Sequence, residues 1–382
     1  MDYKFPKEFM FGTSTAAYQI EGGWNEDAPS GIMNSLNPEG IAYYNRLIDE
    51  LINNDIIPLV TMYHWDLPQY LQDLGGWVNP IMSDYFKEYA RVLFTYYGDR
   101  VKWWITINEP KEVCKGYAYK GYAPYLNLNN TGFYLAAHTQ LIAHGKVYRL
   151  YEEIFKHSQQ GKISISISGV FFIPKNAESV DDINAAERAN QFERGLFSHP
   201  VYKGDYPPIM RKWVDKKSKE EGIPWSKLPT FTEDEIKLIK AYVTSVDEAW
   251  LKPSVAPWLI PVPDGLRQLL IWLKNEYGNP PLIITENGYG DNGQLDDFDR
   301  ISYIKGYLNA TLRAIHENNC NVIGFSVWSL LDNFEWMYGY SIHFGLVKVD
   351  FNDPQRTRIP KASYTFFKNV VSTGQLATPS IS

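Results

Sequence analysis

Short apolar runs rich in β-branched residues alternate with amphipathic stretches along most of this 382-residue chain. This alternation is typical of βα units, in which helices cover a parallel sheet. The predicted strands span residues 9–13, 57–63, 101–108, 162–173, 282–286 and 322–328. The predicted helices span residues 38–54, 81–97, 133–156, 181–195, 207–221, 232–240, 264–277 and 299–318. The sequence therefore predicts an α/β fold.

The predicted strands are too few for a closed barrel. A (β/α)8 barrel needs eight strands, and the chain offers about two fewer. Between the first strand and Ile57 there is room for one helix only. The long stretch before Leu282 has mainly helix and loop patterns, with Tyr242–Val246 as at most a short strand.

Composition limits the kinds of partner. Lys and Arg total 37 against 44 Asp and Glu, a net charge of −7, which argues against a nucleic-acid backbone as partner. No stretch reaches the ~18–20 apolar residues of a membrane span, and the N-terminal residues carry no apolar run of signal-peptide length. Two cysteines, Cys114 and Cys320, cannot form a disulfide framework. We therefore expect a cytoplasmic protein without a nucleic-acid or membrane partner.

Polar or aromatic residues follow four of the predicted strands, at the ends that form the catalytic face of an α/β barrel. Two of them are glutamates, Glu109 and Glu286, each followed by turn residues. Such a pair suits glycoside cleavage, because one carboxyl can protonate the leaving oxygen while the other stabilises or attacks the sugar cation. A single glutamate in such a place would more often be a helix N-cap or a surface ion-pair partner.

Nearby residues fit a sugar site. Aromatic rings can stack on the apolar face of a pyranose, and polar side chains can bind its hydroxyls. The aromatic candidates are Tyr18, Trp65, Trp328 and Trp336, and the polar candidates are Gln19, His64, Asn108 and Glu335.

Other functional interpretations are weaker. His64 and Asp66 with a distant histidine could indicate a metal site, but no His-x-x-x-His pair is present. Cys114 lacks a nucleophile signature, and we expect it to be a buried apolar residue.

Six segments together resemble glycoside hydrolase family 1, which includes β-glucosidases and the β-thioglucosidases called myrosinases, and most closely its insect members. The segments are FMFGTSTAAYQIEG at 9–22, YHWDLP at 63–68, TINEP at 106–110, ITENG at 284–288, VWSLLDNFEW at 327–336, and the tail around 358–364. They are spread over nearly the whole chain.

The resemblance implies a (β/α)8 TIM barrel and retaining hydrolysis of β-D-glucosides or thioglucosides, with no cofactor and no metal. Glu109 would be the general acid/base and Glu286 the nucleophile, with their carboxyls about 5–5.5 Å apart. Plant myrosinases replace the acid/base by Gln, whereas this chain keeps Glu109. The residues corresponding to the sugar site are Gln19, His64, Asn108, Glu335 and Trp336 for the hydroxyls, and Trp328 for the stacking floor.

Lys115 falls where insect thioglucosidase-like members also carry a lysine. A cation there could attract a sulfated aglycone. The alternative is a solvated surface lysine.

Two segments of the family pattern are absent. Asp27 runs directly into Ala28 and Pro29, without the helix and second strand that carry an Arg in the family. After Lys240 the sixth strand, with its Asn-x-Tyr motif, is missing. In the family that Arg and Tyr hydrogen-bond the nucleophile.

We therefore expect a single barrel domain over residues 1–382, shortened near 27–29 and 240–242, that lacks the second and sixth strands. Exposed sheet edges could promote a homodimer. The alternative function is a catalytically inactive sugar-binding or interaction protein derived from the family, or the product of an incomplete splice form or gene model.

Overall fold

The structure is a computed structural model that describes residues 3–22, 36–240, 254–256, 258 and 261–376. These residues form two compact units. Unit 1 comprises the described residues within Met1–Glu21, Gly169–Phe172 and Thr244–Ser382. Unit 2 comprises those within Gly22–Ser168 and Ile173–Val243.

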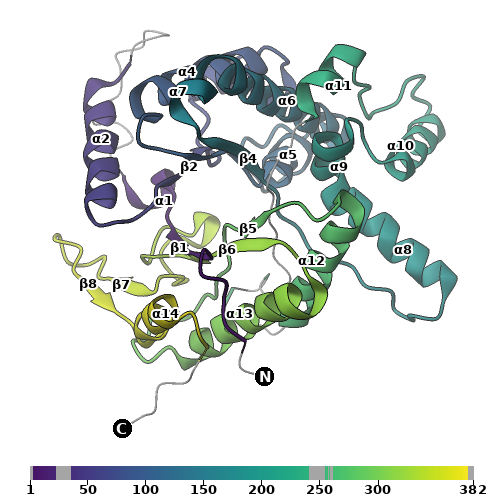
Figure 1. Cartoon of the computed structure of the whole chain (residues 1–382). Coiled ribbons are helices and arrows are strands. Elements are labelled where there is room, and N and C mark those ends of the chain that lie inside the picture. Colours follow the sequence, from purple (N-terminus) through teal and green to yellow (C-terminus); the bar gives the residue numbers. More distant parts are fainter. Residues whose placement is uncertain (1–2, 23–35, 241–253, 257, 259–260, 377–382) are drawn as a thin grey trace. The chain divides into compact units, whose positions relative to one another are not determined.

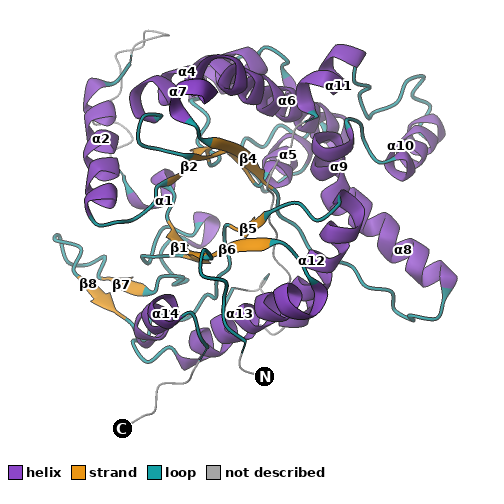
Figure 2. Ribbon diagram, viewed as in Figure 1, coloured by secondary structure: helices purple, strands orange, loops and turns teal. Residues whose placement is uncertain are grey.

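Unit 2 contains a three-stranded parallel sheet in the order β2-β3-β4. The strands are β2 (Leu59–Tyr63), β3 (Trp103–Asn108) and β4 (Lys162–Ser166). Side chains of the central strand β3 are buried from Trp104 onward, as expected for a strand covered on both faces. Parallel pairing places the carboxyl ends of all three strands at one edge of the sheet (Figure 2).

The longest helix of unit 2 forms the centre of its packing. Helix α6 (Asn129–Leu150) contacts both α4 (Met82–Tyr97) and α5 (Pro110–Ala118) and is buried along much of its length. Side-chain caps begin three other helices, where Asn37, Ser179 and Thr232 accept hydrogen bonds from first-turn amides. The other α-helices of this unit are α2 (Pro38–Asn53), α3 (Gln69–Asp73), α7 (Lys156–Gln159), α8 (Val180–Asn190), α9 (Leu196–Lys203), α10 (Pro208–Glu220) and α11 (Glu233–Ile239).

Unit 1 contains a second three-stranded parallel sheet, in the order β1-β6-β5. The strands are β1 (Met10–Ser14), β6 (Val322–Trp328) and β5 (Leu282–Ile284). Helices α12 (Pro263–Tyr277) and α13 (Phe298–Asn318) lie side by side in this unit (Figure 1). The short helix α1 (Ala17–Ile20) follows β1, the antiparallel pair β7 (Val347–Val349) and β8 (Arg358–Pro360) follows β6, and α14 (Ala362–Thr373) ends the described chain.

All six predicted strands are confirmed; β6 has the predicted ends, and the other five have shifted ends. Strand β4 ends at Ser166 rather than at residue 173, because Gly169 has a φ of +139° that an extended strand does not adopt. The predicted helix over 133–156 begins four residues earlier, at Asn129. Helices α5 and α14 and the β7–β8 pair were not predicted. The predicted strand remnant Tyr242–Val246 lies outside the described residues.

No helix in the described ranges has the length and apolar character needed to cross a membrane.

Candidate active site

Glu109 occupies the junction between β3 and α5. Its backbone is left-handed, with φ 45° and ψ 58°, and its N–H donates to the carbonyl of Ser166 on β4 at 2.9 Å. A left-handed non-glycine residue costs of order 1 kcal/mol or more, and such conformations concentrate at functional sites. Pro110 then starts α5 at a position where a missing amide donor costs little. Glu109 is therefore fixed where the sheet of unit 2 ends.

Three further predicted residues lie beside Glu109 in unit 2. The indole N–H of Trp65 donates to the carbonyl of Asn108 at 3.1 Å, and Asn108 Nδ2 lies 3.5 Å from His64 Nε2. The backbone N–H of His64 donates to Asp66 Oδ1 at 3.1 Å, which fixes the loop after β2. Burial lowers the pKa of His64 to about 4, so its ring is neutral at neutral pH. A neutral imidazole offers one donor and one acceptor, which suits a sugar hydroxyl.

Glu286 lies two residues beyond β5 in unit 1, and its neighbours are held by β1 and β6, the other two strands of the same sheet. The Ser14 hydroxyl donates to the carbonyl of Thr285 at 2.9 Å. The Trp328 N–H donates to the carbonyl of Asn287 at 3.0 Å. A Cβ on Gly288 would lie 2.0 Å from the Trp328 carbonyl oxygen, so this position requires glycine. The glycine that follows Asn287 is thus explained by the close packing of two backbones.

Gln19 is clamped against the segment after β6. Its Nε2 donates to Asn333 Oδ1 at 3.2 Å and to the Phe334 carbonyl at 3.0 Å, and the Phe334 N–H donates back to the Gln19 carbonyl at 3.0 Å. The remaining amide oxygen, Oε1, is buried without a hydrogen-bond partner among the described residues. A buried acceptor of this kind is costly unless a ligand completes it. Gln19 therefore has the geometry of a ligand-binding side chain.

Glu335 shows the same combination of burial and an incomplete hydrogen-bond set. Within the described chain its Oε2 is buried and accepts no hydrogen bond. Burial raises the pKa of Glu335 to about 7, because the charged form loses hydration. The next residue, Trp336, stacks on Tyr18 with ring centroids 5.4 Å apart and an interplanar angle of 10°. A buried carboxylate and one ring of an aromatic pair thus lie on consecutive residues.

The predicted site residues fall into two groups. Unit 2 holds Glu109 with Asn108, His64 and Trp65. Unit 1 holds Glu286, Trp328, Gln19, Glu335, Trp336 and Tyr18 at the carboxyl ends of its parallel strands or in the segments that follow. Each group combines a glutamate with side chains able to bind a sugar. No group of three or more His, Cys, Asp or Glu side chains within the described ranges is placed to hold a metal ion.

Several supporting residues were missed by sequence reasoning. Asn333 positions Gln19, and Asn287 is fully buried with neither amide atom hydrogen-bonded to a described residue. Asp332, two residues before Phe334, accepts from Lys361 at 3.0 Å and from the Gly345 N–H at 2.9 Å. The only available signal was the polar pair Asp332-Asn333 within an otherwise aromatic motif.

Cys114 and Lys115 are neighbours on α5 with different surroundings. Cys114 is buried as predicted, and its thiol donates to the Pro110 carbonyl at 3.1 Å. Lys115 pairs with Glu112 at 2.6 Å and lies 5.5 Å from the ring centroid of Tyr122. Burial opposes its charge, but Glu112 outweighs this effect and the pKa of Lys115 is raised. Lys115 is thus a partly buried, paired cation and not a freely solvated one.

Comparison with known proteins gives a consistent result. Residues 1–28, 28–247 and 241–376 match the profile of glycosyl hydrolase family 1. Myrosinase 1 of Brevicoryne brassicae is 66% identical over 463 aligned positions, which cover 98% of this chain and 100% of that protein. The structure of aphid myrosinase superposes with a TM-score of 0.93 at 65% identity, covering 97% of this chain and 100% of that one. A family 1 β-glucosidase from Thermotoga maritima gives a TM-score of 0.86 at 31% identity, covering 99% and 100%.

The alignment with the Brevicoryne protein is longer than this chain. It has 463 positions against 382 residues, so at least 81 positions carry no residue of this chain. The family match is interrupted at residue 28 and at 241–247. These are the two places where the sequence lacks segments of the family pattern.

Proposed function

Because this chain belongs to glycosyl hydrolase family 1 and is a β-glycosidase, we propose that it hydrolyses β-D-glucosides and thioglucosides with retention of configuration. Glu286 acts as the nucleophile and Glu109 as the general acid/base. The observation that carries this assignment is the placement of each glutamate one or two residues beyond a parallel strand, in a unit that also holds side chains with hydrogen-bonding capacity for a sugar.

The reaction proceeds in two displacements. In the first, a Glu286 carboxylate oxygen bonds to the anomeric carbon while the bond to the leaving oxygen breaks, and Glu109 gives that oxygen its proton. In the second, Glu109 takes a proton from water, whose oxygen bonds to the anomeric carbon and releases Glu286. A thiolate leaving group needs less protonation than an alkoxide. Because this chain has a glutamate at position 109, it can protonate an alkoxide leaving group, which supports O-glucosides as substrates alongside thioglucosides.

Sugar binding uses the neighbouring side chains. The buried acceptors Gln19 Oε1 and Glu335 Oε2 accept from hydroxyls. His64, Asn108 and Trp336 contribute further hydrogen bonds, and Trp328 provides the stacking surface. Lys115 supplies a cation for a sulfated aglycone, a role supported by its partial burial.

The same premise leads us to propose that residues 1–382 form one catalytic domain, a (β/α)8 barrel without its second and sixth strands. The interruptions of the family match at residue 28 and at 241–247 support this, as do the six parallel strands found among the described residues.

Turnover of nitrophenyl β-glucoside by the purified chain tests this function. We expect hydrolysis that falls by roughly 100- to 10,000-fold in Glu109→Gln, the usual contribution of a general acid. Glu286→Gln should abolish it, because no nucleophile remains. Glu88→Gln, at an exposed position of α4, is the control and should keep wild-type turnover. A wild-type rate equal to that of Glu286→Gln would instead indicate the catalytically inactive alternative.

A further inference from the structure

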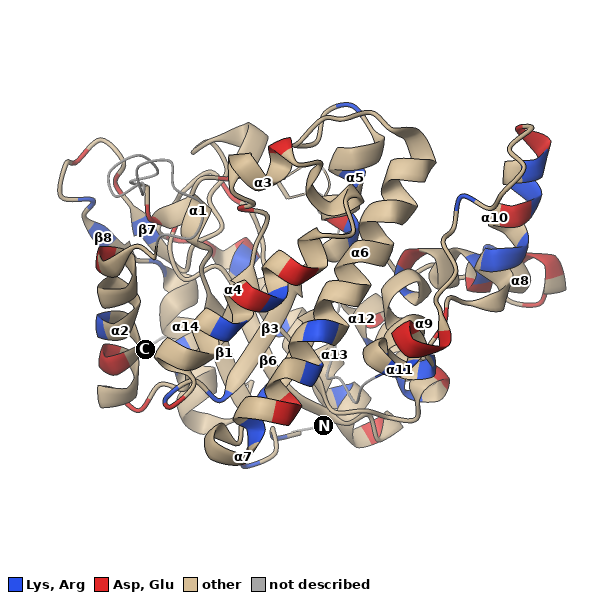
Figure 3. Cartoon of the chain, turned by 90° about the horizontal axis from the view of Figure 1, so that it is seen from above, with Lys and Arg blue, Asp and Glu red and all other residues tan. Residues whose placement is uncertain are grey.

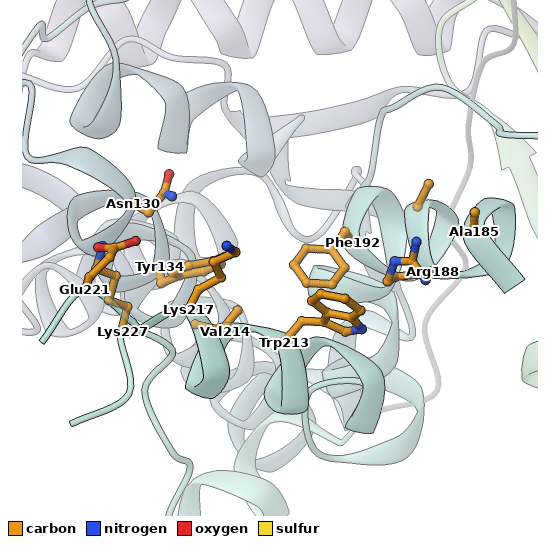
Figure 4. A pocket seen from close by; sticks show the side chains of 11 residues that line it. Asn130, Tyr134, Ala185, Arg188, Phe192, Trp213, Val214, Lys217, Glu221 and Lys227 are labelled. Carbon is orange, nitrogen blue, oxygen red and sulfur yellow. The ribbon is translucent and has the colours of Figure 1, made fainter. Parts of the chain in front are cut away.

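A pocket of about 440 Å³ lies in unit 2, between the helices α6, α8 and α10. Its volume is within the range of small-molecule sites. Figure 4 shows Phe192, Trp213 and Arg188 toward one end, and Tyr134, Lys217, Glu221 and Lys227 toward the other. None of the residues assigned above to catalysis or sugar binding lines this pocket.

The pocket combines apolar walls with positive charge. Phe192, Trp213 and Val214 provide apolar surface, and Tyr134 adds a partly buried ring. Three cations and one carboxylate line it, namely Arg188, Lys217, Lys227 and Glu221. Basic side chains outnumber acidic ones along α10, the helix that provides Trp213 and Lys217 (Figure 3). The net charge of the lining is positive, which favours an anionic ligand.

Arg188 differs from the two lysines in its pairing. Lys227 pairs with Glu221, and Lys217 pairs with Glu220 at 2.7 Å. The Arg188 guanidinium lies 5.1 Å from the ring centroid of Trp213, and no carboxylate of the described residues lies within ion-pair distance of it. An arginine stacked on an aromatic ring is held in a fixed plane and still offers its N–H groups to a ligand.

We propose that this pocket binds a small aromatic anion, such as an aryl carboxylate. The ligand's ring packs against Phe192 and the indole of Trp213, and its carboxylate accepts two parallel hydrogen bonds from Arg188. Lys217 adds long-range attraction across the pocket. The aromatic end of the pocket favours this ligand over inorganic anions, which have no ring. Arg188 favours it over neutral glycosides, which have no charge.

Titration with 2-naphthoate tests the proposal, with the neutral 2-naphthamide as the matched probe. We expect saturable binding of 2-naphthoate in isothermal calorimetry and at least tenfold weaker binding of the amide. Arg188→Met keeps the apolar stem of the side chain and should weaken 2-naphthoate about 10- to 100-fold, the value of a charge-assisted pair. Lys87→Met, at a half-buried position of α4 that does not line the pocket, is the charge control and should leave the affinity unchanged.

Two further measurements separate this site from the catalytic residues. We expect Glu286→Gln to bind 2-naphthoate with wild-type affinity, and saturating glucose not to displace the ligand. Trp213→Ala should weaken both probes, because they share the ring contact. Equal affinity of wild type and Arg188→Met for 2-naphthoate would overturn the proposal, as would displacement by glucose. Circular dichroism of each variant ensures that a loss of binding is not a loss of folding.

Discussion

Two side chains of unit 1 carry the strongest structural signature of a ligand site at the scale of single residues. Gln19 and Glu335 each bury an oxygen that no described residue hydrogen-bonds. Both lie next to segments whose backbone is fixed by other hydrogen bonds, so the oxygens cannot easily turn toward solvent. An exposed glutamine would satisfy its oxygen with water. These two acceptors are thus available to a sugar hydroxyl.

Replacement of Gln19 tests this interpretation. Gln19→Leu keeps the approximate volume but removes the acceptor, so we expect kcat/KM for nitrophenyl β-glucoside to fall by roughly 10- to 100-fold, the value of one or two buried hydrogen bonds. Gln69→Leu, on the exposed end of α3, is the control. Unchanged kinetics in Gln19→Leu would exclude Gln19 from sugar binding.

The raised pKa of Glu335 predicts a specific pH dependence of stability. The folded protein holds this proton up to about pH 7, whereas an unfolded glutamate releases it near pH 4.5. The folded state therefore binds more protons between these values, and stability falls as the pH rises through this window. Glu335→Gln has no such loss, so above pH 7 it should be more stable than wild type by roughly 3 kcal/mol.

Urea denaturation at pH 5 and pH 8 measures this effect. We expect a small difference between Glu335→Gln and wild type at pH 5 and a large one at pH 8. The exposed Glu39→Gln should show no comparable change. A gap between Glu335→Gln and wild type that is the same at both pH values would rule out titration of Glu335 as its cause.

At the scale of elements, a buried group of charges joins the segments that follow β5 and β6. Arg300 on α13 pairs with Asp297 at 2.5 Å and with Asp291 at 2.6 Å. It also donates to the carbonyls of His343 at 2.6 Å and Gly345 at 2.8 Å. All three charged side chains are nearly or fully buried. The group therefore holds the segment after Glu286 against the segment that follows Glu335.

Removal of Arg300 should destabilise the protein strongly. Arg300→Met leaves Asp297 without its paired cation and Asp291 with only the more distant Lys361 at 3.6 Å, and breaking a buried ion pair in this way costs about 3–5 kcal/mol. Arg91→Met breaks an exposed pair with Glu88 and should cost less than about 1 kcal/mol. Chemical denaturation of both variants makes the comparison. Similar losses in the two would show that the buried group contributes little.

The elements also show what the sequence could and could not reveal. Strands and helices with a clear apolar period were found within a few residues, and both glutamates were found because they follow such strands. Helix α5 was missed because Glu109 leads into it through a left-handed turn, and the sequence has no apolar periodicity that indicates such a turn. Asn333 and the buried charges were missed because their partners lie far apart in the sequence. The cytoplasmic location and the homodimer stay predictions.

At the scale of the whole molecule, the segments absent near residues 28 and 240 should limit catalysis. They carry, in the family pattern, the Arg and Tyr that hydrogen-bond the nucleophile. Inserting the corresponding segments of the Brevicoryne protein should raise kcat/KM at least about 100-fold, because a misplaced catalytic group costs roughly that much. Glycine–serine segments of equal length are the control. No gain from the native segments over the control would show that this chain does not need them.

The central claim, that Glu286 forms a covalent bond to the sugar, is tested most directly by trapping that intermediate. An activated 2-deoxy-2-fluoro-β-glucoside reacts with a retaining enzyme and leaves the sugar on the nucleophile, because the fluorine slows both displacements while the activated leaving group restores the rate of the first one only. Mass spectrometry of the digested protein should then find one fluoroglucosyl group on the peptide that contains Glu286, and none in Glu286→Gln. A label on another residue, or none on a folded chain that hydrolyses glucosides, would contradict the account.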